Sequence, residues 1–93
     1  MRQIVEAIIR SIGKGYMFDS HYVIDTIIRD HSDDYLRFAA DNLASGKVTE
    51  YAHSEIAKLI SSFEGSFVEQ QENKSISYNI RGNASECTLW KRI

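Results

Sequence analysis

The chain has 93 residues and a mass of 10.6 kDa, with 43% apolar residues, 26% charged residues, five glycines and no proline. This length suits one domain over residues 1–93 and excludes a second. The net charge of -2 excludes a wholly basic nucleic-acid binder but leaves room for a local basic face. The apolar fraction argues against disorder.

Cysteine usage and the N-terminus both bear on the compartment. Cys87 is the only cysteine, so the chain cannot form an intramolecular disulfide, and a small domain without such bridges fits a reducing environment. Arg2, Glu6 and Arg10 interrupt the apolar residues near the N-terminus, unlike a signal peptide, and no apolar run reaches 18 residues. We therefore expect a cytoplasmic protein that does not enter the membrane.

Apolar residues at helical spacing predict four helices within residues 2–64, or three with one broken near Ser32. The first ends at Gly13, and the second starts at the capping residue Asp19. The third is capped by Ser32, and the fourth, capped by Thr49, ends before residue 65. The predicted apolar stripes are, in chain order, Ile4, Val5, Ile8, Ile9 and Ile12; Val23, Ile24, Ile27 and Ile28; Tyr35, Leu36, Ala39, Ala40 and Leu43; and Ala52, Ile56, Leu59, Ile60 and Phe63.

Beyond residue 65 the apolar period changes from about 3.6 to 2. Phe67 and Val68 can begin a strand, apolar and polar residues alternate over residues 75–80, and a turn signal at 82–85 precedes a second short run. We expect a β-hairpin within residues 75–92, with 75–81 against 86–92. Because a lone hairpin is marginal in water, it must pack on the helices and can also pair with an extended segment at 16–18. The fold class is α+β, with a winged-helix-like layout.

Charge is unevenly distributed along the chain. Residues 15–73 hold four basic and eleven acidic groups, whereas residues 74–93 hold four basic and one acidic group. Basic residues contact phosphate and aromatic rings can stack on bases, so a basic hairpin predicts a DNA-binding module or, equally, a solvated basic surface without that role. The candidate contact residues are Lys74, Tyr78, Arg81, Trp90, Lys91 and Arg92.

Two observations complicate this hypothesis. The helix expected to enter the DNA groove, residues 49–64, carries Glu50 and Glu55, whose carboxylates would repel phosphate. A second interpretation makes residues 82–92 the turn and recognition helix of a helix-turn-helix, although the alternation before them is typical of a strand. From the sequence, segment 82–92 is therefore either strand or recognition helix.

A function of another class is a protein-interaction or homodimeric module. Phe38 and Tyr51 each lie one position off the apolar stripe of their helix, and their exposure beside Tyr22 or Trp90 would create an apolar contact surface. The basic hairpin would then meet an acidic protein surface or a second copy of the chain.

Residues capable of catalysis or metal binding show no recognisable spacing. His21, His31 and His53 lie among acidic residues, without a His-x-x-x-His or Cys-x-x-Cys pattern. Asp19, Ser20 and His21 are adjacent and cannot form a nucleophilic triad among themselves. We expect no catalytic residues, metal, cofactor or small-molecule substrate, and interpret the chain as a non-enzymatic regulatory module.

Four short motifs carry a resemblance to known proteins over residues 16–92. They are Phe18-Asp19-Ser20-His21, His53-x-x-Ile56, Asn79-Ile80-Arg81-Gly82 and Leu89-Trp90-Lys91. In these motifs the chain resembles small uncharacterised bacterial single-domain proteins, including ones encoded by mobile gene cassettes. The resemblance implies a bacterial cytoplasmic source and no known reaction, cofactor or catalytic residue.

Overall fold

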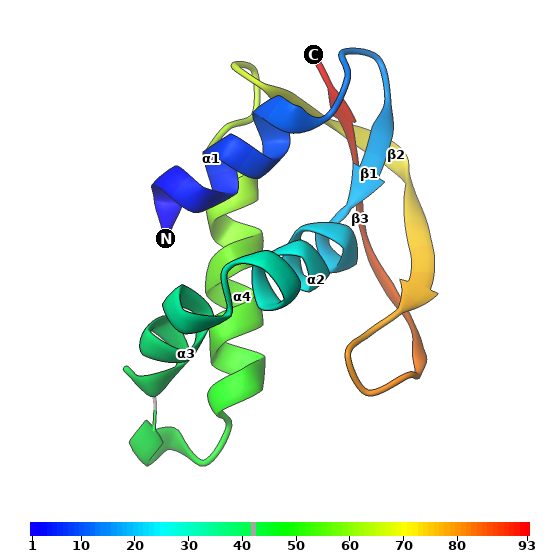
Figure 1. Ribbon diagram of the computed structural model, residues 1–93. Helices are drawn as coiled ribbons and strands as arrows, with labels where there is room; N and C mark the ends of the chain where they lie inside the picture. Colours follow the sequence, from blue (N-terminus) through cyan, green and yellow to red (C-terminus); the bar gives the residue numbers. More distant parts are fainter. Residues whose placement is uncertain (42) are drawn as a thin grey trace.

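The computed structural model describes residues 1–41 and 43–93, and its helices precede a C-terminal hairpin (Figure 1). This confirms the predicted α+β class; residue 42, within the predicted helical part, lies outside the described residues. Within the described residues, no helix is both long and apolar enough to span a membrane. In chain order, the elements are α1 (Arg2–Ser11), β1 (Met17–Asp19), α2 (Ser20–Asp30), α3 (Ser32–Ala40), the 3-10 helix η1 (Leu43–Ser45), α4 (Val48–Ser61), β2 (Val68–Tyr78) and β3 (Ala84–Arg92).

The sheet has the strand order β1-β3-β2, and both pairings are antiparallel. Phe18 lies opposite Trp90, which confirms that the extended segment near residues 16–18 pairs with the hairpin. Residues 84–92 are a strand, so the recognition-helix interpretation of segment 82–92 is wrong. The physical reason is that β3 is the central strand, whose backbone hydrogen bonds to both neighbours replace those of a helix.

The hairpin is longer than predicted because β2 begins at Val68 rather than at residue 75. Val68 lies opposite Arg92, and the register shifts between Gln70 and Lys74. Most side chains over residues 69–74 are polar and exposed, so this part of the strand lacks the apolar alternation by which a half-buried strand is recognised. The turn starts at Asn79, whose side-chain oxygen accepts hydrogen bonds from the backbone amides of Arg81 and Asn83.

The core confirms the stripes predicted for three of the helices. Ile9 of α1, Ile27 of α2 and Ile60 of α4 are fully buried. These helices pack on one another and on the inner side of the sheet (Figure 1). The buried cluster consists of Val5, Ile8, Ile9, Phe18, Val23, Ile24, Ile27, Ile56, Ile60, Phe63, Val68 and Trp90.

The stripe predicted for α3 is wrong in part. Leu36 is 64% exposed, and the predicted Leu43 lies beyond the helix and is also exposed, whereas the off-stripe residue Phe38 packs against the core. The reason is that α3 spans only nine residues and touches α2 and α4 along one narrow side, centred on Ala39. Two predicted caps are also displaced: His31 precedes α3 and Lys47 precedes α4.

Candidate functional site

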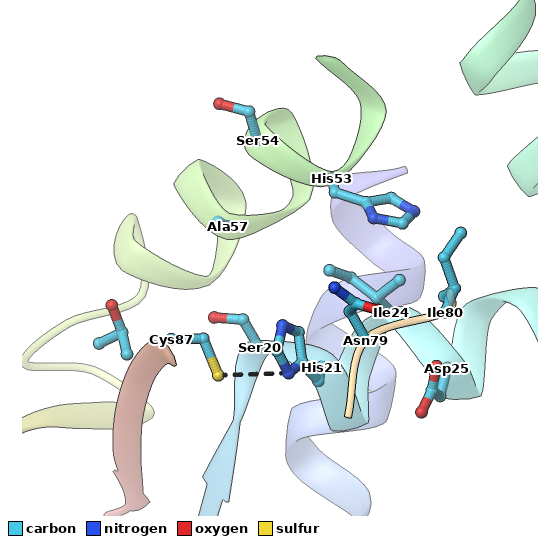
Figure 2. Close-up of a pocket in the computed structure, with 11 residues that line it drawn as sticks. Ser20, His21, Ile24, Asp25, His53, Ser54, Ala57, Asn79, Ile80 and Cys87 are labelled. Carbon is cyan, nitrogen blue, oxygen red and sulfur yellow. Dashed lines mark hydrogen bonds between the residues drawn. The ribbon is translucent and has the colours of Figure 1, made fainter. Parts of the chain in front are cut away.

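A pocket of about 320 Å³ lies where α2, α4 and the hairpin meet (Figure 2). Its lining includes His21 and Asp25 from α2, His53 from α4, Asn79 from the turn and Cys87 from β3. The third histidine, His31, precedes α3 and does not line this pocket. The fold thus gathers residues with catalytic or metal-binding side chains that are far apart in the sequence.

At one side of the pocket, Asp19, His21 and Cys87 form a compact cluster. One ligating atom from each residue lies within 4.8 Å of those of the other two. The Cys87 Sγ is 3.6 Å from the His21 Nδ1, the contact drawn as a dashed line in Figure 2. Asp19 ends β1 and caps α2, and His21 lies in the first turn of that helix, so the α2 N-terminus fixes two of the three groups against β3.

Three serine hydroxyl groups surround this cluster. The Ser77 Oγ lies 2.6 Å from the His21 Nδ1, and the Ser85 Oγ lies 3.3 Å from the Nε2. Ser75 donates a 2.7 Å hydrogen bond to the Asp19 Oδ2. In one tautomer of His21, Nδ1 accepts from Ser77 and the Nε2–H donates to Ser85. In the other, Nδ1–H donates to the Ser77 oxygen, and the Ser77 hydroxyl proton is then directed to Asp19.

Hydrogen bonding controls the charge of Asp19. Partial burial raises the pKa of Asp19, but hydrogen bonds from Ser75, the Tyr22 amide and Ser77 outweigh it, and the net pKa lies below the ordinary value. The Tyr22 amide bond of 2.9 Å confirms the predicted N-cap. Asp19 is therefore an anion at neutral pH, held between a helix N-terminus and β2.

The polar face of the hairpin is the one that meets the helices. Ser75 and Ser77 point toward Asp19 and His21, whereas Ile76 and Tyr78 on the other face are 75% and 71% exposed. The sequence predicts the alternation but not its orientation, since a strand turned over would keep the same pattern. The inner face of this hairpin thus supplies hydroxyl groups to a polar site, and its outer face presents Ile76 and Tyr78 beside the charged Lys74 and Glu86.

Across the pocket, His53 belongs to a second polar pair. The Tyr35 hydroxyl lies 2.9 Å from the His53 Nε2. Burial lowers the pKa of His53, and the Glu50 carboxylate only partly offsets it, so the imidazole is neutral at pH 7 and its Nε2 can accept a hydrogen bond from the Tyr35 hydroxyl. Burial also raises the pKa of Tyr35, which keeps the hydroxyl protonated.

The residues predicted for DNA contact do not share one free surface. Lys74, Tyr78 and Arg81 are exposed, but Arg81 forms a 2.6 Å ion pair with Glu50 of α4. A hydrogen bond from its own backbone amide and the Arg81 guanidinium lower the pKa of Glu50, which is therefore an anion at neutral pH. The tip of the hairpin is thus tied to the acidic helix that was expected to face the DNA phosphates.

The other three predicted contact residues lie nearer the core. Trp90 is only 3% exposed and Arg92 only 8%, so the structure places neither where a base or a phosphate can reach it, and Lys91 is half-buried. Trp90 is buried because it packs in the core against the helices. The Arg92 guanidinium lies over the Phe67 ring, and its Nε donates to the Ile9 carbonyl oxygen. Both side chains therefore hold the sheet to α1 and the core.

Comparisons of the chain with protein-family models, with curated proteins and with solved structures find no match. The resemblance to small bacterial proteins therefore stays a prediction. Sequence reasoning missed the cluster because Cys87 lies far along the chain from Asp19 and His21, and no ligand spacing connects them. The only signal was the serine alternation at residues 75 and 77, which marks one face of the strand as polar.

Proposed function

We propose that the protein is a non-enzymatic interaction module that forms a homodimer by pairing the free edge of β2 with β2 of a second copy. The observation that carries this proposal is a pair of outward apolar side chains on β2, Ile76 and Tyr78, which are among the most exposed apolar side chains. Monomeric proteins rarely leave such residues clustered on an edge strand, because an open edge is a template for pairing.

The strand order supports the same contact. Within the described residues β3 is the only strand that pairs with β2, so the part of β2 from Ser75 to Tyr78 lies at the edge of the sheet (Figure 1). An edge strand leaves the backbone N–H and C=O groups of its free side unpaired. In other proteins, charged side chains and register shifts protect edge strands from pairing. In β2 the charged side chain is Lys74, and the register shift lies between Gln70 and Lys74. The segment from Ser75 to Tyr78 has neither.

This segment is also complementary to itself. When two copies of β2 pair antiparallel about Ser77, Ile76 of each copy lies opposite Tyr78 of the other, so that apolar side chains meet and no like charges do. Each apolar or aromatic cross-strand pair contributes roughly 0.2 to 1 kcal/mol beyond the backbone hydrogen bonds. The resulting contact has two-fold symmetry, the usual form of a homodimer interface.

The mass of the protein in solution tests this proposal. Sedimentation equilibrium of the wild type is expected to give twice 10.6 kDa. Ile76→Lys is expected to give the monomer mass, because it places a charge on the edge that pairs in the dimer. Within its own chain the new lysine lies opposite Glu86, so the hairpin tolerates the substitution. Leu36→Lys is the matched control: it makes the same charge change at an exposed aliphatic residue on α3, away from the hairpin, and should leave the dimer intact.

The proposal would be overturned if the wild type stayed monomeric up to about 1 mM. At that concentration even a dimer with an association free energy of only about 4 kcal/mol is detected. A dimer that Ile76→Lys leaves unchanged would also overturn the proposal. Duplex DNA binding is the competing function, supported by the exposed Lys74 on a hairpin that lies beside α4 (Figure 1).

Titration of a labelled random duplex at about 50 and 200 mM salt tests that competing function. DNA binding that falls steeply with salt and is lost in the double variant Lys74→Ala, Lys91→Ala would favour it. No binding at about 100 μM would exclude it, since non-specific binders respond below that concentration.

A further inference from the structure

The Asp19, His21 and Cys87 cluster combines the three side-chain types that bind zinc in proteins: a carboxylate, an imidazole and a thiol. We propose that these residues bind a Zn²⁺ ion, with a fourth coordination position open to the neighbouring pocket. The inference is independent of the homodimer, because the cluster lies on the inner face of the hairpin and the dimer contact on its outer edge.

The separation of two of the ligands matches the geometry of zinc. With a Zn–S distance of about 2.3 Å, a Zn–N distance of about 2.0 to 2.1 Å and a tetrahedral angle, the sulfur and nitrogen ligands lie about 3.6 Å apart. The Cys87 Sγ and the His21 Nδ1 are 3.6 Å apart. An oxygen of the Asp19 carboxylate lies within 4.8 Å of the Cys87 sulfur and of a His21 ring nitrogen, and it needs to approach by about 1 Å to complete the set. Rotation of the Asp19 side chain can provide this movement.

The protonation states also suit a metal ion. In the His21 tautomer whose Nε2–H donates to Ser85, Nδ1 carries the lone pair that a metal requires. A bound metal takes this lone pair in place of the Ser77 hydroxyl, which then donates to Asp19. The Asp19 carboxylate brings one negative charge to the site. Loss of the Cys87 thiol proton then gives two negative charges against the two positive charges of Zn²⁺, so the loaded site is neutral and its formation releases one proton per ion.

The serine hydroxyls become the surrounding hydrogen-bond partners of the ligands. Ser85 holds the orientation of the His21 ring through Nε2, and Ser75 and Ser77 hydrogen-bond the Asp19 carboxylate. Groups in this position change metal affinity by about 10- to 100-fold when they are removed. The three protein ligands leave one tetrahedral position, which water or a donor atom of a small ligand in the 320 Å³ pocket can fill.

Titration of the full chain with Co²⁺, a spectroscopic substitute for Zn²⁺, tests the site. We expect one Co²⁺ per chain, with a thiolate-to-cobalt charge-transfer band and the intense visible bands of four-coordinate cobalt, and displacement by Zn²⁺. Cys87→Ser is expected to abolish the charge-transfer band. His21→Gln should weaken binding more than about 100-fold and Ser85→Ala about 10- to 100-fold. His53→Gln, at a pocket histidine outside the cluster, is the matched control and should bind Co²⁺ as the wild type does.

A second measurement uses the fact that Cys87 is the only thiol. Zn²⁺ is expected to slow alkylation of Cys87 by iodoacetamide in the wild type but much less in His21→Gln, and circular dichroism confirms that each variant is folded. The proposal is overturned by cobalt binding without a charge-transfer band, by Zn²⁺ failing to protect Cys87, or by a stoichiometry of one ion per two chains, which would place the ion between copies.

Discussion

Removing the Asp19 side chain should show how strongly the hairpin is attached to the helices. Asp19 accepts a hydrogen bond from the Tyr22 amide at the start of α2 and another from Ser75 on β2. The substitution Asp19→Ala removes both bonds and so affects one local and one tertiary interaction. All measurements are made with a chelator present, so that bound metal does not contribute.

The two interactions set the expected cost. Loss of a helix N-cap costs about 0.5 to 2 kcal/mol, and loss of a hydrogen bond of the Ser75 kind costs about 0.5 to 1.5 kcal/mol. Asp19→Ala should therefore lower the free energy of unfolding by about 1 to 3.5 kcal/mol. For a domain of this size, each kcal/mol corresponds to about 4 to 8 °C in Tm. Asp19→Asn keeps a capping side chain and should cost less.

Urea unfolding of Asp19→Ala, Ser75→Ala and the double variant gives the coupling energy between the two side chains. We expect a coupling of about 0.5 to 1.5 kcal/mol at pH 7. Because the folded pKa of Asp19 is lowered, its contribution is present above the unfolded pKa and is lost as the pH falls through the folded value, below about pH 4. A coupling of zero at pH 7 would refute the inward orientation of the serine face, on which both the dimer edge and the zinc site depend.

Two further outcomes test the core and the second polar pair. Ile60→Ala should lower the free energy of unfolding, measured by urea denaturation, by about 2 to 5 kcal/mol because Ile60 is fully buried. Leu36→Ala, on the surface, should change it by less than about 0.5 kcal/mol. Equal effects of the two substitutions would contradict the burial of Ile60 in the core. The pKa of His53 is lower in the folded state than the unfolded value of about 6.5. The wild type should therefore lose stability relative to His53→Gln as the pH falls below that value. Tm measured against pH checks this, and parallel profiles of the two proteins would show that burial does not affect this histidine.

The features that the sequence predicted correctly depend on local periodicity and local hydrogen bonding. The stripes of α1, α2 and α4 follow from residues three and four apart, and the Asp19 cap follows from its position before an apolar repeat. The extended segment at residues 16–18 and the hairpin are confirmed for the same reason, since both were indicated by short runs bounded by turn residues.

Elsewhere the prediction failed because the local sequence pattern does not specify which side chains are buried by tertiary contacts. The first half of β2 is exposed on most of its side chains, so no period of 2 marks it, and α3 is too short for its stripe to specify which residues meet the core. Trp90 and Arg92 look like surface contact residues beside Lys91, but the central strand turns them toward the interior.

The sequence by itself determined the α+β class, the order of helices and hairpin, and the residues that alternate along β2. Only the tertiary structure decided that Ser75 and Ser77 face the helices while Ile76 and Tyr78 face outward, because a period of 2 allows either orientation. It also decided the candidate site: Cys87 meets Asp19 and His21 through pairing of distant strands, and contacts between distant segments leave no fixed spacing in the chain.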